Sequence, residues 1–109
     1  MARDEAWYVE ILGYSTDVVA NIADIQPIII SSFRHGSIGG ALGATLTFYG
    51  CATVDGTYLL IENSGATALS LVKTASRWAQ LPAALFDGPK YIKIINDAAQ
   101  EDFDIALKS

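Results

Sequence analysis

The sequence has few of the residues from which catalytic and metal sites are built. Its 109 residues include one cysteine, one histidine and three prolines. The single Cys51 excludes an intrachain disulfide, and its place in an apolar strand pattern favours a structural role over a reactive thiol. His35 has no partners at metal-ligand spacing, and it is the only base available to Ser31, Ser32 or Ser37. We therefore expect neither an enzyme nor a resident cofactor or metal.

Positive charge and long apolar runs are also scarce. Seven lysines and arginines stand against twelve aspartates and glutamates, which gives a net charge of −5. Nucleic-acid binding needs a basic face, so this balance disfavours it. The isoleucines at 28–30 form a run far shorter than the roughly 20 residues that cross a bilayer, and residues 1–10 show no apolar signal-peptide core. We expect a chain made in the cytoplasm that binds neither nucleic acid nor membrane.

What the sequence does have is alternation with a period of two. It is strongest in residues 44–63, where Leu46 and Phe48 alternate with threonine and tyrosine before an Asp55-Gly56 pair and a second apolar run. This alternation is typical of a half-buried strand, and Asp-Gly favours a two-residue type I′ turn. We predict a hairpin over 44–63 with its turn at Asp55 and Gly56.

Further short strands are predicted along most of the chain. The patterns place them at 7–12, 18–23, 28–30, 68–73, 77–81, 91–96 and 102–108, with another turn at Asp87 and Gly88. Eight or nine such strands without a convincing helix favour an all-β fold, either an antiparallel two-sheet β-sandwich of jelly-roll type or a barrel. We expect a single domain over 17–109, preceded by an N-terminal arm or extra strand at 1–16.

The most irregular segment lies at 32–43. It holds Gly36, Gly39, Gly40 and Gly43, and glycine serves loops and close backbone approach. It lacks the Gly-Lys-Ser/Thr end of a phosphate-binding loop, and a strand pattern follows it instead of a helix. We predict a loop here that contacts other proteins.

Two groups of side chains leave alternatives open. The first group is the acids before and within the last strand, which we expect to form a solvated polar face that includes Asp102 and Asp104. The alternatives are a weak calcium site made of Asn96, Asp97 and Glu101, or a catalytic pair of carboxylates. The large aromatics either pack in the core and at subunit contacts, which we favour, or form a carbohydrate platform; they are Trp7, Tyr8, Tyr49, Tyr58, Trp78 and Tyr91.

From residue 44 onward the sequence resembles a family of small structural proteins of tailed bacteriophages and prophages. The resemblance lies in the order and spacing of short motifs: Leu46-Thr47-Phe48, Asp55-Gly56-Thr57, Asn63-Ser64-Gly65, Leu81-Pro82, and the stretch from Phe86 to Lys93. It covers about residues 17–109 and includes a similar final strand. The glycine-rich 37–43, where relatives often have a proline and a tryptophan, and the additional 7–12 depart from the pattern.

The resemblance implies a non-enzymatic virion component. The preferred form is a capsid decoration (cement) protein that binds the major capsid protein lattice as a symmetric homo-oligomer, with a trimer preferred. The alternatives are a neck, tail or head-fibre component with a glycan-binding role in host adsorption, and a bacterial carbohydrate module unrelated to phage. The predicted protein-contact residues lie in the N-terminal segment and in the predicted loop at 32–43: Trp7, Tyr8, Phe33, Arg34, His35 and Ile38.

Overall fold

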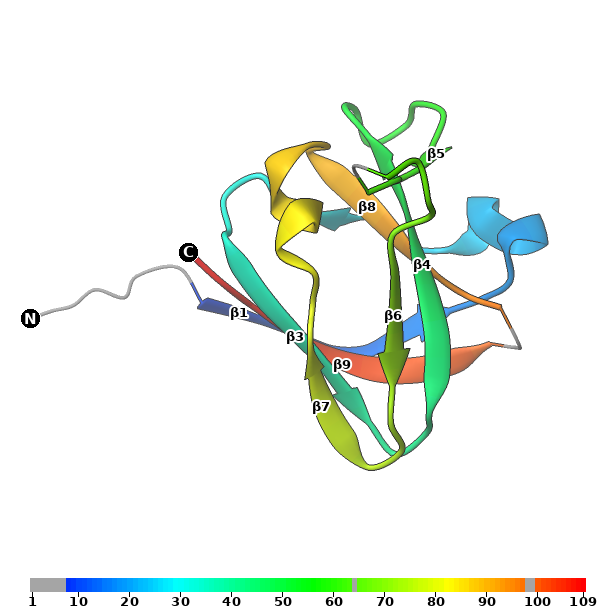
Figure 1. Ribbon diagram of the computed structural model, residues 1–109, viewed down its shortest axis with the longest axis vertical. Coiled ribbons are helices and arrows are strands. Elements are labelled where there is room, and N and C mark those ends of the chain that lie inside the picture. Colours follow the sequence, from blue (N-terminus) through cyan, green and yellow to red (C-terminus); the bar gives the residue numbers. More distant parts are fainter. Residues whose placement is uncertain (1–7, 64, 98–99) are drawn as a thin grey trace, which may run out of the picture.

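The computed structural model describes residues 8–63, 65–97 and 100–109. These residues form two antiparallel sheets packed against each other, with two short 3-10 helices (Figure 1). The elements in chain order are β1 (Tyr8–Thr16), η1 (Val19–Asp24), β2 (Ile28–Ile29), β3 (His35–Gly40), β4 (Ala44–Cys51), β5 (Leu59–Leu60), β6 (Ser70–Lys73), β7 (Arg77–Gln80), η2 (Ala83–Asp87), β8 (Tyr91–Asn96) and β9 (Glu101–Lys108).

The order of the strands is that of a jelly roll. One sheet runs β1-β9-β3-β7, and the other runs β2-β8-β4 with β5 and β6 both on the far side of β4. β6 pairs with the first half of β4 and β5 with its end, so together they occupy one strand position. Each sheet then interleaves early and late strands of the chain, as in a two-sheet jelly roll. The predicted antiparallel β-sandwich is confirmed.

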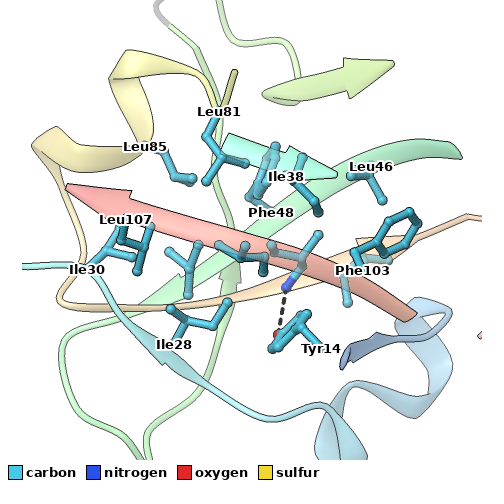
Figure 2. Close-up of a cluster of buried hydrophobic side chains, with 14 of the residues drawn as sticks. Tyr14, Ile28, Ile30, Ile38, Leu46, Phe48, Leu81, Leu85, Phe103 and Leu107 are labelled. Atoms are coloured by element: carbon cyan, nitrogen blue, oxygen red, sulfur yellow. Dashed lines mark hydrogen bonds between the residues drawn. The ribbon is translucent and has the colours of Figure 1, made fainter. Parts of the chain in front are cut away.

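The core lies between the two sheets and follows the alternation of the sequence. On β9, Phe103, Ile105 and Leu107 are buried, whereas Asp102 and Lys108 face solvent. Figure 2 shows Phe103 and Leu107 among the buried side chains of the opposite sheet, such as Phe48 and Leu46. Burying one such side chain contributes roughly 1.5–3 kcal/mol. Other core members are Ile25, Ile28, Ile30, Leu46, Phe48, Leu81, Leu85, Ile92, Ile94 and Ile95.

Tyr14 on β1 joins the two sheets through its hydroxyl. The hydroxyl donates to the Gln26 carbonyl at 2.6 Å. It also accepts a hydrogen bond from the Ile94 backbone N–H at 3.3 Å, the dashed line in Figure 2. In the ladder between β2 and β8, Ile28 pairs with Ile92, so Gln26 and Ile94 are the partners two residues further on. β2 does not reach Gln26, so the Gln26 carbonyl and the Ile94 N–H do not bond to each other directly. The Tyr14 hydroxyl links these two backbone groups instead.

The predicted strand at 18–23 is wrong. These residues lie largely within η1, which contacts β8 and contains no fully buried residue. Asp17 favours the tight turn, because its carboxylate accepts hydrogen bonds from the Val18 N–H at 2.8 Å and the Asn21 amide at 3.3 Å. The β-branched residues there suit a strand locally, but these side-chain bonds and a crossing between sheets outweigh that preference.

The predicted loop at 32–43 is also wrong for half of its length, because His35–Gly40 form β3 between β9 and β7. The glycines allow close packing here. A Cβ on Gly36 would lie 2.8 Å from Leu81 Cδ1 and 3.0 Å from Leu107 Cδ2. A glycine-rich sequence can therefore form a central strand where neighbouring side chains fill its faces.

The hairpin at 44–63 pairs as β4 and β5, and Asp55 and Gly56 lie in the connection as predicted, but the predicted two-residue type I′ geometry is wrong. Residues 52–58 connect the strands, and the Gly56 N–H donates to the Thr53 carbonyl at 3.4 Å. A type I′ turn needs positive φ at Asp55 and Gly56, and neither residue has it. The second predicted turn lies at the end of η2, where Asp87 is the last helical residue and Gly88 the C-cap.

The first strand runs beyond the predicted 7–12, because Gly13 does not end it. With φ of 66° it forms a bulge between Ile11 and Tyr14, and β1 continues to Thr16. Its N–H donates to Asp104 Oδ1 at 3.0 Å, which gives one of the predicted solvated acids a structural partner. Residues 8–16 thus form an edge strand that pairs with β9 along its length, while residues 1–7 lie outside the described part.

Candidate functional site

The structure separates the predicted contact residues into surface and core. Tyr8, Arg34 and His35 are exposed. Phe33 and Ile38 are not available to a partner, because they retain 8% and 0% exposure within the core. They were predicted on a surface loop, whereas β3 directs Ile38 inward against β9. Trp7 lies outside the described residues.

Tyr8 and His35 meet other exposed side chains on the outer face of the four-stranded sheet. This face carries a shallow cavity of about 460 Å³, here called the sheet-face cavity. All four strands contribute to it: Tyr8 and Glu10 from β1, Lys108 and Ala106 from β9, His35 and Ser37 from β3, and Trp78 and Gln80 from β7.

Strand register places these side chains in rows across the sheet. The middle row runs from Glu10 through Ala106 and Ser37 to Gln80. The two inner positions carry small side chains, so the floor of the cavity is low there. Tyr8 on β1 lies in the next row on one side, with Lys108 and His35. Trp78 on β7 lies in the next row on the opposite side, with Gly39 and Asp104. The cavity is therefore a low floor with an aromatic residue at each of two opposite corners.

The indole of Trp78 lies flat on the sheet. It pairs with Gly39 on β3, and a Cβ on Gly39 would fall 2.5, 2.7 and 2.8 Å from Trp78 Cδ2, Cε2 and Cε3. Three ring atoms at nearly equal distances mean that the ring covers the Gly39 Cα face-on. Trp78 nevertheless keeps 60% of its surface exposed. Glycine at position 39 thus leaves room for a flat indole whose other face is open to solvent.

The Tyr8 corner is organised by polar contacts. Its hydroxyl donates to Glu10 Oε2 at 3.0 Å, and this hydrogen bond raises the pKa of Tyr8. Lys108 Nζ lies 5.6 Å from the centre of the Tyr8 ring, within the range of a cation–π contact. One acid and one base therefore lie beside the ring, and the cavity does not gather charge of one sign.

The described residues contain few groups of the kind that form catalytic or metal sites. They contain no group of three or more His, Cys, Asp or Glu side chains that could hold a metal ion. Cys51 is half-buried, with its sulfur 3.9 Å from the Thr53 hydroxyl. Neither short helix within the described ranges is long and apolar enough to cross a membrane.

Sequence reasoning placed Trp78 in a strand but favoured the core or a subunit contact for it, and it did not single out Gln80, Glu10 or Lys108. Alternation in residues 77–80 puts Trp78 and Gln80 on one face, which is a usable signal. This alternation did not indicate a binding surface, because the neighbouring strand β3 was predicted to be a loop. Without β3, nothing indicated that Gly39 lies beneath the indole.

Comparison of the chain with models of protein families, with curated proteins and with solved structures gives no match.

Proposed function

We propose that this chain is a non-enzymatic structural protein of a tailed-phage particle, a capsid decoration protein that binds the head lattice as a symmetric oligomer. The kind of particle comes from the resemblance of residues 17–109 to small phage structural proteins. The fold suits it, since jelly rolls form many viral capsid domains. The observation that carries the oligomer is the open edge of β1.

β1 is the edge strand of its sheet and carries exposed apolar residues. Leu12 is 72% exposed, Tyr8 52% and Val9 41%. Natural proteins usually guard such edges with lysine, proline, a covering element or a bulge, and the bulge of β1 lies only at its far half, around Gly13. Here the stretch from Tyr8 to Leu12 has one charged residue, Glu10, and no proline or lysine. Such an edge suits a strand added from a neighbouring subunit.

A symmetric oligomer would turn this edge into a means of binding a lattice. Each copy would present the same surface to equivalent capsid sites, and several weak contacts would add up through effective concentration. The net charge of −5 opposes non-specific binding to the packaged nucleic acid. The protein's role would then be to reinforce the shell from outside.

Two residues with the same exposure allow a matched test. Leu12 on β1 and Val72 on β6 are each 72% exposed, but they lie on different sheets. We expect the wild-type protein to be oligomeric by light scattering and to co-sediment with expanded heads that lack it. Leu12→Lys should weaken both, and Val72→Lys should change neither. A monomer that ignores heads, or equal losses from the two substitutions, would refute the proposal.

A further inference from the structure

We propose that the sheet-face cavity binds a neutral oligosaccharide, with one sugar ring stacked on Trp78 and its neighbours hydrogen-bonded by side chains of β3 and β7. This inference does not rest on placement in a phage head. It rests on the shape, polarity and backbone pairing of one face of the sandwich.

The indole of Trp78 has the orientation that stacking requires. It lies flat over Gly39 with its far face open. The apolar C–H face of a pyranose ring fits such a surface, since the face of an aromatic ring carries partial negative charge and the C–H groups partial positive charge. A tryptophan held against backbone also loses little side-chain freedom on binding.

Polar side chains surround the indole. Gln80 lies one row away on the same strand, and Ser37 stands opposite Gln80 on β3. An amide and a hydroxyl can each donate and accept, as sugar hydroxyls require. Hydrogen-bonding groups therefore lie within one row of the apolar indole, as a sugar ring with both C–H and hydroxyl groups requires.

The cavity is long enough for more than one ring. Strand spacing and rise per residue place the Cα atoms of Tyr8 and Trp78 roughly 20 Å apart across the four strands. On the other side of the indole lies a second depression of about 300 Å³, lined in part by Ser76, Arg77 and Asp104. An extended chain of sugars could therefore pass over Trp78 from one depression into the other.

Two other ligand classes fit less well. Each of the two inner strands, β9 and β3, is paired on both sides, so a peptide cannot add to them as a strand over the cavity. A phosphate group needs converging positive charge, whereas Glu10 lies beside the same Tyr8 ring as Lys108. The mixed charge favours a neutral polar ligand.

The test is a titration with tetrasaccharides of glucose, mannose and N-acetylglucosamine, after a glycan array to select among them. Tryptophan emission reports stacking on Trp78 if Trp7→Phe is used as the parent, because the chain has two tryptophans. We expect saturable binding by the parent. Trp78→Ala leaves no tryptophan in this parent, so its binding is measured by calorimetry; it should be weaker by about tenfold or more, since the stacked surface is lost.

Gly39→Ala is the sharper variant, because it keeps Trp78 but adds a methyl group where the ring lies. Calorimetry should show binding weakened as much as by Trp78→Ala, at a temperature where circular dichroism shows the variant to be folded, while Val72→Ala leaves binding unchanged. Gln80→Ala gives a second lost contact if Gly39→Ala does not fold. No binding at millimolar sugar, binding that survives Trp78→Ala, or an oligomer that dissociates on Trp78→Ala without any sugar bound would overturn the inference.

Discussion

The hydroxyl of Tyr14 gives the most direct test of how the two sheets are held together. Tyr14→Phe keeps the ring in the core but removes the donor to the Gln26 carbonyl and the acceptor for the Ile94 N–H. Tyr14 is 3% exposed, so water has little access to the groups left behind. Hydrogen bonds contribute about 1 kcal/mol each, and a buried unsatisfied partner costs about 1–3 kcal/mol. We expect a loss of about 2–4 kcal/mol in the free energy of unfolding.

Urea unfolding followed by circular dichroism measures this loss, and the thermal midpoint should fall by about 10 °C or more. The matched control is Tyr49→Phe. Tyr49 is a half-buried tyrosine on the outer face of β4, and its hydroxyl makes no hydrogen bond to another described residue. A loss below about 0.5 kcal/mol for Tyr14→Phe, or an equal loss for the control, would refute the bridging role.

The same hydroxyl predicts an alkaline loss of stability. Burial raises the pKa of Tyr14 in the folded protein above its usual value of 10.0. A raised pKa means that the contribution is complete below pH 10 and is lost as pH rises above it, at up to about 1.4 kcal/mol per pH unit. The difference in unfolding free energy between wild type and Tyr14→Phe should therefore shrink above pH 10. A constant difference up to pH 11.5 would show that the hydroxyl is not buried.

Three further substitutions test other parts of the fold. Lys73→Met should destabilise the protein by about 2 kcal/mol in chemical denaturation, because the buried Lys73 ammonium donates to the carbonyls of Gly40, Leu42 and Thr74 at 2.6–2.9 Å. Burial lowers the pKa of Lys73, so the wild type should gain stability as pH rises toward 10.5 and the variant should lack that gain; equal pH slopes would contradict this. Gly13→Ala should cost about 1–2 kcal/mol in thermal unfolding because φ is positive there, and an unchanged midpoint would argue against the bulge. Gly56→Val should also lower the unfolding midpoint, because its side chain would collide with Cys51 Sγ; an unchanged midpoint would contradict the close approach.

The sequence predicted the strands whose side chains alternate, because alternation records which face is buried. β8 was predicted with its observed bounds, 91–96, and β9 to within a residue. The helix η1 was missed because its β-branched residues suit a strand. That they form a helix depends on the course of the chain between the two sheets, which the local sequence does not show. β3 was missed because its glycines give no alternation of apolar and polar side chains. These glycines are needed because Leu81, Leu107 and Trp78 pack closely against them.

The candidate site was less predictable for the same reason. Tyr8 and His35 were expected to be at the surface, but their convergence with Trp78 depends on β3 lying between β9 and β7. Residues far apart in the sequence meet there through strand order, which alternation cannot supply. Ile38 was placed on the wrong side because its strand was read as a loop.

The central claim, that the chain is an oligomeric decoration protein of a phage head, is tested most directly by a cryo-EM map of particles assembled with and without it. We expect additional jelly-roll density at symmetric positions outside the shell, with the β1 edge from Tyr8 to Leu12 covered by a neighbouring subunit. Particles that lack such density although the protein is present, or density in which the β1 edge faces only solvent, would contradict the account.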